Sequence, residues 1–367
     1  MNSHESCIAL NLIPGIGFVR YTALLEHFGS VEAVFDAPAD ELRQVPGFGE
    51  QLAERVAAFD RSEVEREIAA ADKGGVRIFT LGDPDYPGVL KELYDPPLCL
   101  YWRGHLPDPE RPLVAIVGSR RLSSYGSRMT EHIAADAAAA DFIVVSGLAL
   151  GADTAAHTAA VEQGKPTIGV IGSGMVNFYP QCNLELARKM IDCGGAILSE
   201  FPLNFPIHRT NFPRRNRIVA ALSRAVIVTE AGVDSGAMIT ARQAAELGRE
   251  VFAVPGHADN PQAQGCHKLI KEGAGLIENF ADVMEALGFG HVEEPDLPGI
   301  DDVPSGASPD ELAVLAAIAE KGEASLEYLK ESTGFETGAL LSALMKLELK
   351  LIVERGDDQL YRRVGGK

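Results

Sequence analysis

Residues 113–147 read LVAIVGSRRLSSYGSRMTEHIAADAAAADFIVVSG: an apolar run, an Ala-rich helical stretch and a second apolar run. Val and Ile dominate both apolar runs, which is typical of strands buried on both faces of a sheet. The alternation continues with apolar runs at 167–172, 196–200, 225–230 and 250–256. Strands that alternate with helices predict an α/β fold with a doubly wound parallel sheet and right-handed crossovers.

Gly, Ser and Arg residues gather where the expected strands end. In a parallel sheet, ligands bind beyond the carboxyl ends of the strands. Backbone amides, helix N-termini and guanidinium groups at that edge are typical of a phosphate site. The residues expected to form it are Gly118, Ser119, Arg120, Arg121, Gly147, Gly151, Gly172, Gly174, Ser235 and Gly236.

Charge is segregated along the chain. The 367 residues carry a formal net charge of −19, yet residues 201–229 contain no Asp or Glu and five Arg. Residues 111–130 likewise contain no acid and four Arg. Arg interleaved with Phe suits a polyanion with stackable bases, which is single-stranded nucleic acid. The prediction therefore adds Arg209, Phe212, Arg214, Arg215 and Asn216 to the site.

Arg209 and Phe212 are expected on a loop before a helix that carries the other arginines. Arg209 would clamp a phosphate and Phe212 would stack on a base, which is worth roughly 1–3 kcal/mol per base. The alternative for Phe212 is a core side chain that anchors the loop.

Arg214, Arg215 and Arg217 cannot all face one ligand, because successive helix positions point in different directions. Arg217 is expected to be structural and to pair with Glu200 or Glu230.

Several function classes lack support. No G-x-x-x-x-G-K-[ST] is present and no G-x-G-x-x-G opens the first helix, so P-loop hydrolysis and dinucleotide binding are not indicated. The five cysteines are scattered and never spaced C-x-x-C, which favours reduced thiols in the cytoplasm over a zinc site. No apolar run suggests a membrane span or secretion signal.

His157 is expected to be a hydrogen-bonded helix residue without a role in acid–base catalysis.

Residues 1–70 repeat a pattern, in which Pro14-Gly15-Ile16-Gly17 and Pro46-Gly47-Phe48-Gly49 each precede an amphipathic stretch. This resembles the tandem helix-hairpin-helix and SAM-like modules, which grip DNA phosphates through backbone amides. Glu50 and Glu54 follow the second copy, so a bundle used for packing or protein contacts stays an equal alternative. Residues 71–111 are expected to connect this bundle to the sheet through short strands.

The remaining chain divides into three parts. The sheet domain is expected to span 71–288, and a Pro-, Gly- and acid-rich linker 289–308. Residues 309–367 show three helical stretches and two short strands, the order of a winged helix. This block has 8 Lys and Arg against 11 Asp and Glu, a net charge of −3. A protein contact or weak binding is therefore favoured over the reading of DNA sequence.

Eight strings in residues 114–278 carry a resemblance to a known family: GSRRLSSYG, SGLALGADTAAH, GSGMVNFYPQCN, SEFP, FPRRNRIVAALSRAVIVTEA, SGAMITARQA, VFAVPG and GCHKLIKEGA. In order and spacing they are similar to the DNA-processing protein A family, DprA or Smf. Two positions depart from it. His267 stands where the family usually has Asn. Leu150 stands where it often has Arg, which predicts one weaker phosphate contact.

The resemblance implies an extended Rossmann-like domain between a SAM-like N-terminal and a winged-helix-like C-terminal domain. It implies a protein, not an enzyme, that binds single-stranded DNA, protects incoming strands and loads the recombinase RecA during natural transformation. It further implies a cytoplasmic homodimer with no cofactor, no metal and no membrane association.

Two alternatives stay open. VTEAGVDSGAMITA is similar to the PGGxGTxxE loop of nucleotide phosphoribohydrolases, in which case Glu230 would be catalytic and Arg120 would hold a phosphate. The glycine doublet and the downstream Glu of that loop are absent here. A winged-helix transcription regulator is the third interpretation, and the acidic C-terminal block disfavours it.

Overall fold

The computed structural model describes residues 1–289, 308–350, 352–356 and 359–363. The chain divides into two compact units, Met1–Gly290 and His291–Lys367, and each is considered by itself. The linker predicted at 289–308 lies almost entirely outside the described residues. Within those residues, no helix combines the length and apolar character that a bilayer span requires.

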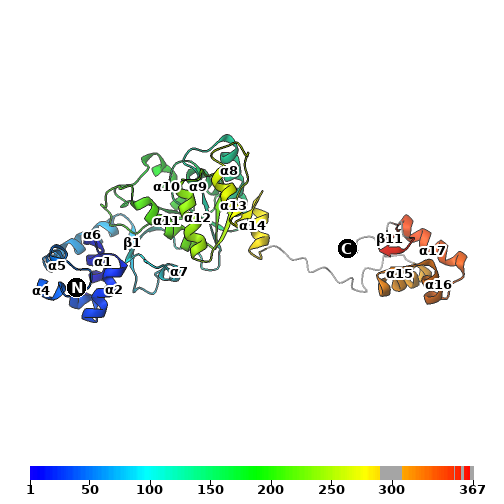
Figure 1. Ribbon diagram of the computed structural model, residues 1–367, viewed down its shortest axis with the longest axis horizontal. Helices are drawn as coiled ribbons and strands as arrows, with labels where there is room; N and C mark the ends of the chain where they lie inside the picture. Colours follow the sequence, from blue (N-terminus) through cyan, green and yellow to red (C-terminus); the bar gives the residue numbers. More distant parts are fainter. Residues whose placement is uncertain (290–307, 351, 357–358, 364–367) are drawn as a thin grey trace. The chain divides into compact units, whose positions relative to one another are not determined.

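Six helices open the first unit (Figure 1), and Leu10, Leu24 and Leu42 are completely buried in their core. As the repeat predicts, each Pro-Gly-x-Gly turn leads into a helix, with Gly17 and Gly49 as extended N-cap residues. The helices are α1 (Ser3–Leu12), α2 (Phe18–Phe28), α3 (Val31–Val34), α4 (Ala39–Leu42), α5 (Glu50–Ala57) and α6 (Ser62–Lys73).

A nine-stranded sheet follows, in the order β1-β2-β6-β5-β4-β3-β7-β8-β9. All six predicted strands are confirmed, and from β6 to β9 neighbouring strands run parallel. The predicted connecting region also extends the sheet, because β2 pairs antiparallel with β6 and β1 pairs antiparallel with β2. The strands are β1 (Val76–Thr80), β2 (Cys99–Gly104), β3 (Leu113–Val117), β4 (Ile143–Ser146), β5 (Thr167–Val170), β6 (Ala196–Ser199), β7 (Ala225–Val228), β8 (Glu250–Ala253) and β9 (Gly275–Leu276).

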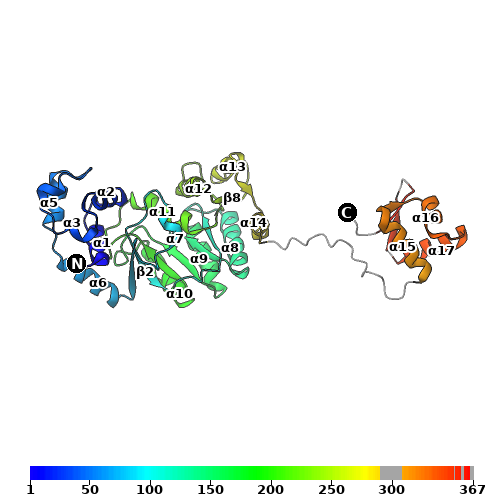
Figure 2. The ribbon, with the colours of Figure 1, turned by 90° about the horizontal axis from the view of Figure 1, so that it is seen from below.

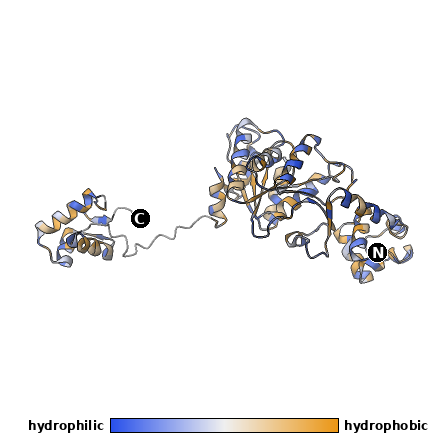
Figure 3. Ribbon diagram, turned by 180° about the vertical axis from the view of Figure 1, so that it is seen from behind, coloured by the Kyte–Doolittle hydropathy of each residue, from blue (hydrophilic) through white to orange (hydrophobic). Residues whose placement is uncertain are grey.

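Helices cover both faces of the sheet, as the doubly wound prediction requires (Figure 2). Val114 and Ile116 pack against α8, α9 and α14, whereas Ala115 and Val117 point to α11, α12 and α13. The hydropathy colours of Figure 3 alternate along these helices, as expected for amphipathic helices. The helices are α7 (Gly88–Lys91), α8 (Ser124–Ala139), α9 (Ala152–Glu162), η1 (Gln181–Asn183), α10 (Leu184–Asp192), α11 (Asn211–Leu222), α12 (Gly236–Glu246), α13 (Gln264–Lys271) and α14 (Phe280–Ala286).

The order of the strands fixes where a ligand can enter. From β3 the chain moves outward through β4, β5 and β6 on one side, and then returns to β7, β8 and β9 on the other. The loops after β3 and β7 therefore diverge and leave a crevice at the carboxyl ends of these strands.

The second unit packs three helices on a small antiparallel sheet of order β10-β12-β11. Its core contains Leu340, Leu344 and Leu347, while Leu341, Met345 and Leu349 on the same helix are exposed. The winged-helix assignment stays a prediction. The elements are α15 (Pro309–Lys321), β10 (Glu323–Ala324), α16 (Leu326–Thr333), α17 (Thr337–Leu349), β11 (Val353–Arg355) and β12 (Tyr361–Arg363).

Candidate functional site

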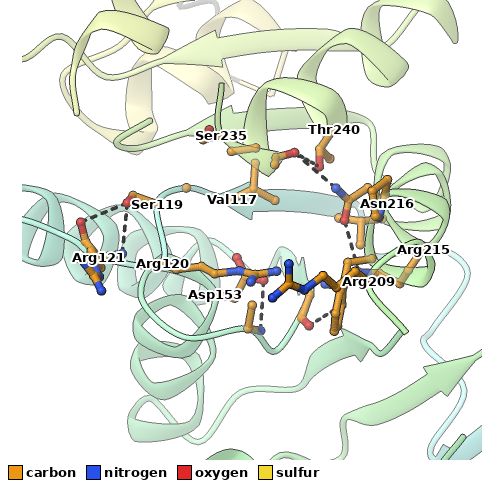
Figure 4. A pocket seen from close by; sticks show the side chains of 18 of the residues that line it. Val117, Ser119, Arg120, Arg121, Asp153, Arg209, Arg215, Asn216, Ser235 and Thr240 are labelled. Atoms are coloured by element: carbon orange, nitrogen blue, oxygen red, sulfur yellow. Dashed lines mark hydrogen bonds between the residues drawn. The ribbon is translucent and has the colours of Figure 1, made fainter. Parts of the chain in front are cut away.

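A cavity of about 850 Å³ opens at the carboxyl ends of β3 and β7. Figure 4 shows Arg120, Arg209 and Arg215 close together on one side, with Ser235 and Thr240 on the opposite wall. Most of the predicted site residues meet here, although they come from four separate segments. Those that line the cavity are Gly118, Ser119, Arg120, Arg121, Gly147, Arg209, Phe212, Arg215, Asn216, Ser235 and Gly236.

Arginine and aromatic side chains form the mouth of the cavity. The Arg120 guanidinium lies 5.3 Å from the centroid of the Phe212 ring, a cation–π distance. The Phe212 and Tyr179 ring centroids are 5.8 Å apart, with 49° between the planes. Arg120 and Arg209 are exposed, and within the described part of the chain neither has an ion-pair partner. Two cations beside two aromatic rings can hold both a phosphate and a base.

Phe212 lies in the first turn of α11 and not on the preceding loop, so that part of the prediction was wrong. Its ring is partly exposed, because it sits where the helix meets the cavity. Arg209 does lie on the predicted loop, two residues before the helix begins at Asn211. A helix holds the ring more rigidly than a loop does, which favours a preformed stacking face.

The N-terminus of α12 forms another wall. Ser235 is its N-cap residue, and the Ser235 Oγ atom is buried without a hydrogen-bond partner among the described residues. The first amides of the helix add partial positive charge. The Asn216 Nδ2 donates to the Gly236 carbonyl at 3.2 Å and so joins α11 to α12 across the cavity wall.

Arg215 lines the cavity, but its guanidinium is largely committed to the protein. Its Nη1 donates to the carbonyls of Gly147 and Val170, and the group faces the buried carboxylate of Asp153. A side chain at position 147 would occupy the space that Arg215 fills. Burial lowers the pKa of Arg215 to about 10, against the opposing effect of Asp153. Arg215 therefore stays positively charged at neutral pH, and it would attract an anion in the cavity mainly through its electric field.

Arg217 and Arg214 meet at one carboxylate outside the cavity. Arg217 pairs with Glu200, not Glu230, through hydrogen bonds of 2.8 and 2.9 Å. The Arg214 Nε lies 3.2 Å from the same carboxylate, and its guanidinium stacks on Phe201 at 5.6 Å. Arg217 is thus structural, as predicted. The prediction of Arg214 as a cavity residue is not supported by its position.

Three predicted glycines serve the framework instead of the cavity wall. Gly151 has a φ of +82° and touches the backbone of Ser119 and Arg120, so the loops after β3 and β4 meet there. Gly172 underlies the Phe212 ring and lines a narrower pocket beside the cavity. Gly174 lies against the backbone of residues 202–203.

Glu230, the catalytic residue of the enzyme interpretation, does not line the cavity. It is buried, and it accepts hydrogen bonds from the Ser123 amide at 2.7 Å and from the Asn260 side chain at 3.1 Å. These contacts fix the start of α8. No cluster of three or more potential metal-ligating side chains occurs within the described ranges.

His157 is buried on α9 and contacts the Thr167 hydroxyl at 2.8 Å, as expected for a hydrogen-bonded helix residue. Burial and, to a lesser degree, Arg215 lower the pKa of His157 to about 3. The ring is neutral at physiological pH.

The sequence analysis missed Tyr179, Ile207 and Gln262, which also line the cavity. The sequence does contain a signal for Tyr179. Phe178-Tyr179-Pro180 follows the third apolar run, just as the Gly and Arg residues of the predicted site follow other apolar runs. Of the two positions that depart from the family, Leu150 is half exposed and borders the narrower pocket. His267 contacts the Gly256 carbonyl at 3.0 Å, away from the cavity.

The sheet order and the Arg- and Gly-rich edge define a Rossmann-like protein with an arginine-lined crevice. Residues 77–288 match the family model described as DNA recombination-mediator protein A, and residues 8–59 match a SAM-like helix-hairpin-helix tandem. The chain belongs to the DNA recombination-mediator protein A family, which is also called DprA or Smf.

Relatives of known sequence and structure agree with this assignment. Protein Smf of Synechocystis is 32% identical over 391 residues, which cover 97% of this chain and 98% of the relative. The structure of DNA processing protein A from Streptococcus pneumoniae matches with a TM-score of 0.67 and 35% identity, over 78% of this chain and 98% of that one. The Helicobacter pylori protein, whose structure concerns its single-stranded DNA binding mode, matches with a TM-score of 0.51 and 31% identity, over 58% of this chain and 96% of that one.

Proposed function

We propose that this protein is a single-stranded DNA-binding mediator that protects incoming DNA and loads RecA during natural transformation, without catalysis of its own. The DNA strand would cross the cavity at the carboxyl ends of β3 and β7. Its backbone would meet Arg120 and Arg209, and its bases would stack on Phe212 and Tyr179.

One observation carries the proposal: two exposed arginines without ion-pair partners in the described chain stand beside a pair of partly exposed aromatic rings. Cations alone would suit any phosphate. Stackable rings add affinity for unpaired bases, which a duplex does not expose. The single-stranded DNA binding of the Helicobacter pylori relative supports the same ligand here.

The acidic chain restricts how binding works. With a formal charge of −19, most of the surface repels DNA, so attraction depends on the local arginine cluster. Affinity should therefore fall steeply with added salt.

Binding is tested by fluorescence anisotropy of labelled oligo-dT at two salt concentrations, with duplex DNA as competitor. The proposal expects a preference for the single strand. Equal competition by duplex, or no binding at low salt, would contradict it.

The handover to RecA, the homodimer and the cytoplasmic location are part of the proposal. Relatives that are named DNA processing proteins support the DNA-processing role itself. RecA loading is tested by RecA filament assembly on DNA that is covered by single-strand-binding protein. Assembly should accelerate only when this protein is present. Light scattering gives the mass of the protein in solution, and twice the chain mass is expected.

The nucleotide-cleaving alternative makes a different prediction for the same cavity. It needs Glu230 to reach a ribose, whereas Glu230 is buried and engaged by Ser123 and Asn260. Incubation with nucleoside monophosphates, followed by chromatography for free base, tests it. Release of base that disappears in Glu230→Gln would overturn the non-enzymatic proposal.

A further inference from the structure

The segment that carries Arg209 has two different halves. Residues 201–205 are held firmly: Leu203 is buried among side chains of the N-terminal helices, and the Phe201 and Phe205 rings stack at 4.8 Å. Residues 206–210, which include Arg209 and Ile207, are exposed. The position of the exposed half therefore depends on how the first half is anchored.

The anchor on one side is Glu67, a residue of α6 in the N-terminal bundle. Its Oε1 accepts a hydrogen bond from the Leu203 amide at 2.7 Å, and the side chain is buried with 8% exposed. A buried carboxylate is costly unless it is hydrogen-bonded, so the bond from the Leu203 amide helps to stabilise Glu67 in its buried position. Glu67 also lies near Tyr101 of β2, where burial above all, together with the neighbouring Cys99 and Glu67 side chains, raises the pKa of the Tyr101 hydroxyl.

The loop after β5 holds the segment from the other side. The Gly174 amide donates to the Phe205 carbonyl at 3.1 Å, and the Val176 amide donates to the Leu203 carbonyl at 3.0 Å. A side chain at Gly174 would collide with the carbonyls of Pro202 and Leu203. The base of the Arg209 segment is thus clamped between α6 and the loop that carries Tyr179.

We propose that Glu67 is a positioning residue for the DNA site. Through Leu203 it fixes residues 203–210, so the N-terminal bundle sets where Arg209 meets the strand. The bundle thereby gains a role in single-stranded DNA binding without contact with the DNA. This inference rests on the proposed function of the cavity.

The first test measures oligo-dT affinity by anisotropy for Glu67→Ala, with Glu65→Ala as the matched control, since Glu65 is an exposed glutamate of the same helix. Glu67→Ala should weaken binding about tenfold, the equivalent of one hydrogen bond to a charged acceptor. Glu67→Gln keeps an acceptor oxygen and should bind close to the parent protein. Glu65→Ala should bind like the parent protein.

A double-mutant cycle separates positioning from general destabilisation. If Glu67 acts through Arg209, adding Glu67→Ala to the Arg209→Ala variant should raise the dissociation constant for oligo-dT by less than about twofold. Full additivity of the two losses would overturn the inference. So would parent-like binding by Glu67→Ala.

A third readout needs no DNA. Hydrogen exchange of residues 203–210 and tryptic cleavage after Arg209 should both accelerate in Glu67→Ala, and unchanged rates would overturn the inference. This readout does not depend on DNA binding. If the protein fails to bind single-stranded DNA, the proposed function is refuted, and hydrogen exchange still tests whether Glu67 anchors residues 203–210. If Glu67→Ala does not fold, the same measurements are made on Glu67→Asp. The aspartate side chain is one methylene shorter, so its carboxylate should not reach the Leu203 amide.

Discussion

Arg209 and Arg217 stand eight positions apart in the same acid-free run, yet they have opposite environments. Arg209 is exposed at the cavity mouth. Arg217 is buried against Glu200, whose side chain is 2% exposed, and also contacts Asp95. A run of arginines in a sequence therefore contains two populations: one holds the helix in place, and the other remains available for a ligand.

The largest effect should come from the buried population. Arg217→Ala leaves the Glu200 carboxylate without its main partner, so the free energy of unfolding should fall by about 3–5 kcal/mol. Chemical denaturation measures it. Arg214→Ala is the control, because its half-exposed side chain should contribute about 1 kcal/mol or less. Equal losses for the two variants would refute the division into two populations.

Phe212→Ala should produce the next largest effect, now on binding. Loss of one stacked base costs roughly 1–3 kcal/mol, or about 5- to 150-fold in the dissociation constant for oligo-dT. Phe212→Tyr retains a ring and should bind nearly as the parent protein does. If Phe212→Ala loses stability and leaves affinity unchanged, the ring is a core residue.

Arg209→Ala should weaken binding less, and it should do so for every base sequence. The removal of one phosphate contact should reduce the magnitude of the slope of log affinity against log salt by about 0.7, the value per phosphate for single strands. Arg188→Ala is the matched control, since Arg188 is exposed on α10 beside Glu185 and does not line the cavity. An unchanged slope in Arg209→Ala would mean that Arg209 touches no phosphate.

These contrasts show what the sequence could predict. The six strands and the doubly wound parallel sheet follow from periodic patterns and were predicted correctly, and most of the Arg and Gly residues expected at one edge of the sheet meet there. Whether an individual arginine is held in an ion pair or left exposed depends on partners far away in the sequence, such as Glu200 and Asp95. No local sequence pattern indicates these partners. Helix boundaries are equally hard to predict, which is why Phe212 was expected on a loop. The hydrogen bond from Leu203 to Glu67 joins residues 136 positions apart and left no sequence signal.

The last expected effect concerns the pH dependence of stability. The folded pKa of His157 is about 3, below the ordinary 6.5, so the unfolded chain binds the extra proton between these values. Stability should rise with pH through this window and be lost as pH falls. His157 alone should account for about 2 kcal/mol between pH 7 and pH 5. Denaturation of His157→Gln at both pH values checks this, and an equal pH dependence in variant and parent would contradict it.

The central claim is that single-stranded DNA lies across the cavity at the ends of β3 and β7. Photo-crosslinking with oligonucleotides that contain 5-iodouracil, followed by mass spectrometry of the linked peptides, tests it most directly. We expect cross-links at Tyr179 and Phe212, reduced by unlabelled oligo-dT and not by duplex. Cross-links confined to the N-terminal helices or to the C-terminal unit would contradict the claim and place the DNA elsewhere.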